Sequence, residues 1–159
     1  MKDGLEIRRA NSTDAMSIAK CVKAAYEHYI GRIGKPPGPM LDDYIDVVQR
    51  QTVFVAVSDE VVGVLVLMQT QTAILLDNVA VRPDHQGKGL GKRLIKLAEL
   101  EASDQGFEKL DLYTHESMSE NIEIYKTLGY TETERRKECG YNRVYMQKQL
   151  SGKHRANAL

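Results

Sequence analysis

Apolar and polar residues occur in blocks along the chain, and these blocks predict a sheet covered by helices. Apolar stretches that favour strands occupy 52–57, 61–70 and 72–81, and the polar turn 58–60 joins the first two as a hairpin. The next block is amphipathic, because its apolar residues recur at helical spacing. These residues are Leu90, Leu94, Leu97, Ala98 and Ala102.

The whole chain predicts the order strand, two helices, three strands, helix, strand, helix and two strands. This order argues for a mixed α/β or α+β sheet covered by helices. The segment 29–40 holds three of the four prolines and three glycines, so it is predicted to be a non-helical loop. The remaining strands are expected at 5–9, 109–114, 131–136 and 142–148, and the helices at 11–29, 41–50, 89–104 and around Asn121.

Composition is typical of a small single-domain protein. The 159 residues suit one domain at 1–150 with a short, frayed tail at 151–159. The 22 basic and 22 acidic residues balance, so nothing favours nucleic acid or a membrane surface as a partner. Two cysteines, Cys21 and Cys139, are too few for a disulfide framework or a zinc site, so no metal is expected and cytoplasmic localisation is predicted.

The segment Gln86–Gly91 is a candidate anion-binding loop. It follows the apolar strand and a short turn, and it opens the amphipathic helix. Glycines let a backbone approach a ligand closely, and the free amides at a helix start point toward negative charge. Lys88, Lys92 and Arg93 add positive charge, so the loop suits a pyrophosphate.

Two common nucleotide-binding motifs do not fit this loop. The dinucleotide fingerprint requires glycine or alanine where Lys92 stands, counting from Gly87. The Walker pattern requires Ser or Thr where Arg93 follows Gly91-Lys92, and Gln86 occupies the place of its first glycine. A nucleotide-binding domain is therefore disfavoured.

The spacing Gln-x-x-Gly-x-Gly after Val-Ala-Val resembles the coenzyme A loop of the GCN5-related N-acetyltransferase (GNAT) superfamily. A second segment, Met118–Tyr130, resembles the late GNAT signature, with an asparagine, a helical tyrosine and a Leu-Gly-aromatic step. The resemblance covers residues 5 to 148. It implies the GNAT fold, a central, mixed but mostly antiparallel, twisted sheet of about seven strands flanked by about four helices.

The resemblance also implies residue roles. Tyr125 is expected to be the general acid that protonates the leaving thiolate, and Asn121 to lie near the pantetheine arm one helical turn before it. A backbone amide near Val79 is expected to stabilise the oxyanion. The residues expected to contact acetyl-CoA are Val79, Ala80, Val81, Gln86, Gly87, Lys88, Gly89, Leu90, Gly91, Lys92, Asn121 and Tyr125.

The acceptor side is defined by fewer signals. Asp77 interrupts an apolar strand, and it is either a general base or a carboxylate that faces solvent or pairs with a lysine. His115 is a rival base, or a structural histidine. Arg32 is a candidate partner for an acceptor carboxylate, and Tyr29 and Asn78 are further candidate acceptor contacts, unless the segment 29–40 is only a stiff surface loop.

The predicted function is N-acetyl transfer from acetyl-CoA to a primary amine, by direct attack. The acceptor is a small-molecule or peptide amine, and a homodimer is typical of the family. The alternative is a non-catalytic CoA-binding sensor or interaction module of the same fold. Thiol release separates the two, because a sensor binds CoA and releases nothing.

Overall fold

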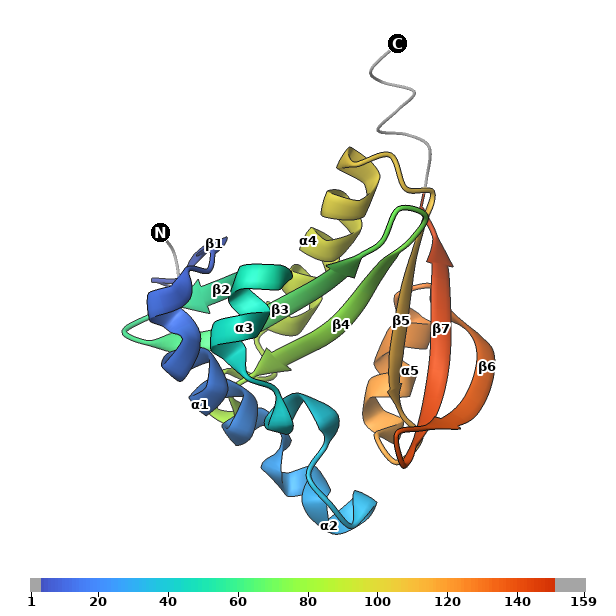
Figure 1. Cartoon of the computed structure of the whole chain (residues 1–159), viewed down its shortest axis with the longest axis horizontal. Coiled ribbons are helices and arrows are strands. Elements are labelled where there is room, and N and C mark those ends of the chain that lie inside the picture. The colour runs from blue at the N-terminus through green and yellow to red at the C-terminus, as the bar shows by residue number, and fades with distance from the viewer. Residues whose placement is uncertain (1–3, 151–159) are drawn as a thin grey trace.

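The structure is a computed structural model that describes residues 4–150 (Figure 1). Its strands form one sheet in the order β1-β2-β3-β4-β5-β7-β6. Strands β4 and β5 are parallel, and every other neighbouring pair is antiparallel. The strands are β1 (Glu6–Arg9), β2 (Thr52–Val57), β3 (Val61–Gln69), β4 (Ile74–Val81), β5 (Lys109–His115), β6 (Thr131–Glu138) and β7 (Tyr141–Gln149).

Helices cover both faces of this sheet. Figure 1 shows α1 and α3 on one side and α4 and α5 on the other. Strand β3 contributes to both cores, because Val64 and Val66 pack with α1 while Leu65 and Leu67 pack with α4. Burial on both faces explains why β3 is a continuous apolar run rather than an alternating one. The helices are α1 (Ala15–Tyr26), α2 (Ile30–Ile33), α3 (Tyr44–Arg50), α4 (Leu90–Asp104) and α5 (Ser119–Thr127).

The predicted fold class is confirmed, and the strand bounds agree with the structure to within two residues. The prediction that the segment 29–40 excludes helix is wrong. The segment 29–40 contains α2 and the start of a 3₁₀ turn at Gly38–Leu41. Both are single turns: Gly34 ends α2 in the left-handed conformation, and Pro39 lies near the start of the 3₁₀ turn, where an amide hydrogen is dispensable. The predicted tail at 151–159 lies outside the described residues.

Strands β4 and β5 are paired over only a short distance. The parallel ladder joins Leu75 to Asp111 and Leu76 to Leu112. Just beyond it, the β3–β4 register shifts, so that Asp77 is an extra residue on β4. Figure 1 shows the two strands diverging from there toward their C-terminal ends. This divergence makes room for side chains, and for pockets, between β4 and β5.

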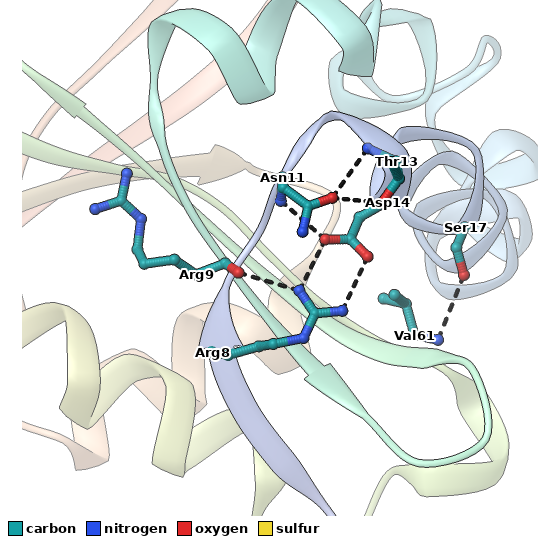
Figure 2. A network of polar contacts seen from close by, with 7 residues as sticks. All are labelled: Arg8, Arg9, Asn11, Thr13, Asp14, Ser17 and Val61. Atoms are coloured by element: carbon teal, nitrogen blue, oxygen red, sulfur yellow. Dashed lines mark hydrogen bonds and ion pairs between the residues drawn. The ribbon is translucent and has the colours of Figure 1, made fainter.

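A polar network fixes the first turn before α1 (Figure 2). The Asp14 carboxylate accepts hydrogen bonds from both terminal nitrogens of Arg8, at 2.9 and 3.0 Å, and from the Asn11 amide at 2.9 Å. The Asn11 side chain in turn accepts from the Thr13 amide. The guanidinium of Arg8 holds the pKa of Asp14 below its usual range. The network therefore joins β1 to the start of α1.

Replacing Asp14 should lower stability, because the substitution removes one half of the capping box and leaves Arg8 without its partner. We expect Asp14→Ala to lower the free energy of unfolding by about 1–2 kcal/mol in urea denaturation. Asp59→Ala, the same change in an exposed hairpin turn, is the control and should stay within about 0.5 kcal/mol of wild type. Equal effects of the two substitutions would contradict the role assigned to the network.

Candidate functional site

Two pockets lie where β4 and β5 diverge. The first, here called the glycine-loop groove, runs from the loop before α4 to α1 and α5, with a volume of about 520 Å³. The second, here called the tyrosine pocket, lies between β4, β5, β7 and the segment 33–39, with a volume of about 60 Å³. Four residues line both pockets, and these are Tyr26, Val79, Asn121 and Tyr125. The two pockets therefore meet at one place, beside the β-bulge that the extra residue Asp77 makes in β4.

The loop before α4 presents open backbone to the groove. Gly87 and Gly89 have φ of 80° and 84°, the left-handed region that favours glycine, and nothing lies within 4 Å of where a β-carbon would be on either residue. The Gln86 side chain donates to the Val81 carbonyl at 2.9 Å and so closes the turn. Because α4 begins at Leu90, its first amides have no partner within the helix. The loop is thus shaped to receive an anion.

Ten of the twelve residues predicted to contact acetyl-CoA line this groove. They are Val79, Ala80, Val81, Gln86, Gly87, Gly89, Gly91, Lys92, Asn121 and Tyr125. The other two lie elsewhere. Lys88 is exposed outside the lining, and the Leu90 side chain is buried in the core, so that only its backbone faces the start of the helix.

Tyr125 is buried on α5, and its hydroxyl faces the junction of the two pockets. Its ring packs edge-on against Tyr130, with the centroids 5.8 Å apart. Within residues 4–150 the hydroxyl makes no hydrogen bond to the protein, although no fully enclosed side-chain oxygen or nitrogen there lacks a partner. The hydroxyl must therefore open into the pockets. Burial raises the pKa of Tyr125, so the phenol keeps its proton at neutral pH.

Asp77 lines the tyrosine pocket and is held by a tyrosine of the neighbouring strand. The Tyr113 hydroxyl donates to Asp77 Oδ1 at 2.7 Å. Burial raises the pKa of Asp77, whereas the hydrogen bond from Tyr113 and the charge of Arg143 oppose this shift. Within the described residues Oδ2 makes no hydrogen bond. The structure therefore gives no lysine partner for Asp77, and it leaves one carboxylate oxygen available to a ligand.

The neighbouring Asn78 is committed to the protein itself. Its amide nitrogen donates to the Tyr44 hydroxyl at 3.1 Å, and its Oδ1 lies 2.8 Å from the Tyr26 hydroxyl. The Tyr44 hydroxyl donates onward to the Pro39 carbonyl at 2.7 Å. Asn78 is only 3% exposed, although it lines the tyrosine pocket. Its hydrogen bonds stabilise the position of β4, and this role suits Asn78 better than direct contact with an acceptor.

His115 lines the tyrosine pocket from the end of β5. Its Nδ1 accepts a hydrogen bond from the Ser117 amide at 3.0 Å. Burial lowers the pKa of His115, and the nearby charge of Lys35 lowers it further, while Glu116 opposes the shift. The neutral ring then carries its proton on Nε2, so neither nitrogen has a lone pair available. This geometry favours Asp77 over His115 as a base.

Tyr29 and Arg32 do not line the tyrosine pocket. Tyr29 is buried and lines the glycine-loop groove instead. The two terminal nitrogens of Arg32 each donate to a carboxylate oxygen of Glu120 at 2.7 Å, and one of them also donates to the Ser117 carbonyl. That bidentate pair lowers the pKa of Glu120 to about 2. A carboxylate-binding role for Arg32 would require this pair to break.

The sequence analysis missed several residues of the tyrosine pocket, among them Tyr26, Tyr113, Tyr141 and Arg143. Tyr26 falls on the apolar face of α1 and looks like an ordinary core residue. The other three, Tyr113, Tyr141 and Arg143, lie on β5 and β7, and the sequence did not predict that these strands pair. In the structure, β5 and β7 align Tyr113 with Tyr145 and His115 with Arg143. Alternation along β7 was the available signal, since it places Tyr141 and Arg143 on one face.

Residues 4–150 contain neither a candidate membrane span nor a candidate metal site. None of the helices in this range is both long enough and apolar enough to cross a bilayer. The same range contains no group of three or more His, Cys, Asp or Glu side chains placed to hold a metal ion.

Proteins of known structure share this architecture. An acetyltransferase of the GNAT family from Elizabethkingia anophelis with acetyl-CoA bound is 19% identical with a TM-score of 0.73, covering 93% of this chain and 99% of that chain. The PaiA N-acetyltransferase of Thermoplasma acidophilum in complex with coenzyme A is 18% identical with a TM-score of 0.73, over 91% and 98% of the two chains. At this level of identity, both similarities establish the fold.

Sequence comparison is more specific. The uncharacterized N-acetyltransferase YvbK of Bacillus subtilis (strain 168) is 27% identical over 99 residues, which are 62% of this chain. The matched region spans 63% of the length of that relative. The family model of the acetyltransferase (GNAT) domain matches residues 49–132, a range that contains β2 to β5, the glycine loop, α4 and α5. The predicted resemblance is confirmed, and the chain belongs to the GNAT acetyltransferase family.

Proposed function

We propose that this chain transfers an acetyl group from acetyl-CoA to a primary amine by direct attack. The observation that carries the proposal is the junction of the glycine-loop groove with the tyrosine pocket at Tyr26, Val79, Asn121 and Tyr125. A thioester in the groove and an amine in the pocket would meet there. Family membership, and the fold shared with structures that hold acetyl-CoA or coenzyme A, support this assignment.

The groove suits two parts of coenzyme A, the pyrophosphate and the pantetheine arm. Gly87, Gly89 and the first turn of α4 offer backbone amides to the pyrophosphate, and Lys92 adds a positive charge. Asn121 and Tyr125 lie one turn apart on α5, so both face the inner end of the groove. The pantetheine arm would run between β4 and α5, and the thioester would lie beside Val79.

Asp77 is the proposed general base. An amine must be neutral when it attacks the thioester carbonyl, so its proton passes to Asp77 directly or through one water. The carboxylate lines the pocket from β4 with Oδ2 open to a ligand. The raised pKa of Asp77 makes it a stronger base than an ordinary aspartate.

Tyr125 is the proposed general acid. As the carbon–nitrogen bond forms and the carbon–sulfur bond breaks, the CoA thiolate leaves and takes the phenolic proton. The hydroxyl has no competing acceptor in the described residues and opens into the junction. The backbone amide of Val79 is the proposed donor to the oxyanion that forms in the first step.

An acetyl-CoA turnover assay tests the whole proposal. Free thiol is measured with a panel of amines, and CoA binding is measured by calorimetry on the same sample. Thiol release that depends on an amine supports the enzyme. CoA binding without release for every amine would instead support the sensor alternative.

A negative charge in the glycine loop should weaken CoA binding strongly. We expect Gly89→Glu to weaken CoA binding by about a hundredfold, or about 2.8 kcal/mol, in calorimetry. The matched control is Gly106→Glu, because Gly106 also has a positive φ and open space, but it lies beyond the other end of α4. Similar losses in the two variants would mean that backbone strain, rather than the loop, explains the effect.

Removing the Tyr125 hydroxyl should affect turnover more than binding. We expect Tyr125→Phe to lower kcat by about a hundredfold, while the Kd for CoA changes little. Tyr130→Phe removes the neighbouring hydroxyl, which bonds to Glu99 outside both pockets. It should cost stability but leave the kcat of the folded enzyme within a few-fold. An unchanged kcat in Tyr125→Phe would exclude the acid role.

Activity should fall in acid as Asp77 takes up a proton. Because its pKa is raised, the base form is lost at a higher pH than for an ordinary aspartate, and kcat/KM falls as pH drops through that value. We expect Asp77→Asn to lower kcat/KM and to lose this lower inflection in the pH profile. His115→Asn should keep it. The reverse pattern would transfer the base role to His115.

A further inference from the structure

The tyrosine pocket carries opposite charges on its two walls. Asp77 lies on the β4 wall, and Arg143 lies on the β7 wall. Tyr113 lies between them, since its hydroxyl donates to Asp77 Oδ1 and the Arg143 guanidinium carbon lies 4.2 Å from its ring centroid. The two charged groups therefore contact the same phenol, Asp77 at its hydroxyl and Arg143 over its ring face. The pocket is small, so a ligand inside it would contact both walls.

The positive charge of the β7 wall is only partly compensated. Nη1 of Arg143 donates to Glu138 at 3.1 Å, and Glu138 also pairs with Arg136 at 3.2 Å. Within residues 4–150 no other carboxylate lies within salt-bridge distance of Arg143. Lys35 of the segment 33–39 adds a second cation near this wall, outside the pocket lining, with its Nζ 4.2 Å from the ring centroid of Tyr141. This wall is suited to a carboxylate.

Much of the rest of the lining is apolar or aromatic, and its polar members are Asn78, Thr114, His115 and Asn121. Four of the eight tyrosines of the chain line this one pocket. The segment 33–39 forms the roof, and the Tyr141 hydroxyl holds it by donating to the Pro36 carbonyl at 2.6 Å. Apolar side chains line the roof and the adjoining start of α5, and these are Ile33, Pro37, Pro39 and Met118. Such a lining favours a ligand with an apolar group.

We propose that the acceptor is a free amino acid with an apolar or aromatic side chain, its amine toward Asp77 and its carboxylate toward Arg143. The proposal rests on the proposed acetyl transfer and assigns its substrate class. An ammonium and a carboxylate joined by one carbon match two walls of opposite charge whose charged groups contact the same ring. A peptide N-terminus and a protein lysine have an amide or a methylene where this carboxylate would be, so they leave Arg143 without a partner.

The wild-type protein provides a direct test. L-Phenylalanine, L-leucine and L-methionine are each compared with their amides and with the amines that lack the carboxyl group. We expect kcat/KM to favour the acid over both analogues by about tenfold or more. The amide is a strict comparison, because its amine loses its proton more easily than that of the acid. Preference for the acid therefore cannot come from amine protonation.

A variant of Arg143 tests the carboxylate contact. We expect Arg143→Met to reduce the ratio of kcat/KM for the acid to that for the amine by about tenfold or more, and Arg143→Lys to restore part of it. The control is Arg135→Met, since Arg135 lies exposed on β6 and pairs with Glu132, outside the pocket. It should leave the ratio unchanged. A structural role for Arg143 would lower both rate constants together and leave the ratio intact.

The outcomes separate this proposal from the proposed function. Transfer to amines and amides at rates equal to or above those of the acids would overturn the amino-acid assignment and leave acetyl transfer standing. CoA binding with no transfer to any of the nine compounds would overturn the amino-acid assignment, and only a lack of transfer to every amine of the wider panel would overturn both. Melting temperature and CoA affinity, measured for each variant, exclude misfolding as the cause of a lost preference.

Discussion

The functional part of this structure depends on the early end of one parallel strand pair. Strands β4 and β5 stay paired only at Leu75 and Leu76, and the extra residue Asp77 then turns β4 away. A bulge redirects side chains and ends pairing, which is why bulges occur beside active sites. In this chain the bulge leads to both pockets, because the residues after it line the tyrosine pocket and then the glycine-loop groove.

A strand that leaves its neighbour needs other support, and here side chains provide it. The Tyr26 hydroxyl lies 2.7 Å from the Val79 carbonyl and 2.8 Å from Asn78 Oδ1, and Asn78 reaches Tyr44 on α3. These groups are buried, so each hydrogen bond also prevents the cost of an unsatisfied polar atom. The network joins α1, α3 and β4, and it fixes Asn78 and Val79, the two residues that follow Asp77. Rigid β4 backbone is what a preorganised site requires.

The sequence predicted the fold and most of the lining of the glycine-loop groove, because both depend on local patterns. Glycine spacing, a preceding apolar strand and a following amphipathic helix lie within one continuous segment, so the loop before α4 could be recognised without knowledge of the sheet. The short helix α2 was missed because the prolines and glycines around it predict a loop. A single helical turn nevertheless fits there, since Gly34 ends it and the prolines lie beyond it.

The tyrosine pocket could not be predicted equally well, because its residues come together only through strand pairing. Asp77 and Arg143 are distant in sequence, and they meet because β5 lies between β4 and β7 in the sheet order. Arg32 is a different case: a cation in a loop suggested a ligand contact, and in the structure both of its terminal nitrogens donate to Glu120 of α5. Since Glu120 also lines the glycine-loop groove, this pair joins α2, which leads into the roof of the tyrosine pocket, to the wall of the groove. The segment 30–41 is thus held across the diverging strands by side chains at three points, Arg32, Pro36 and Pro39, and not by sheet pairing.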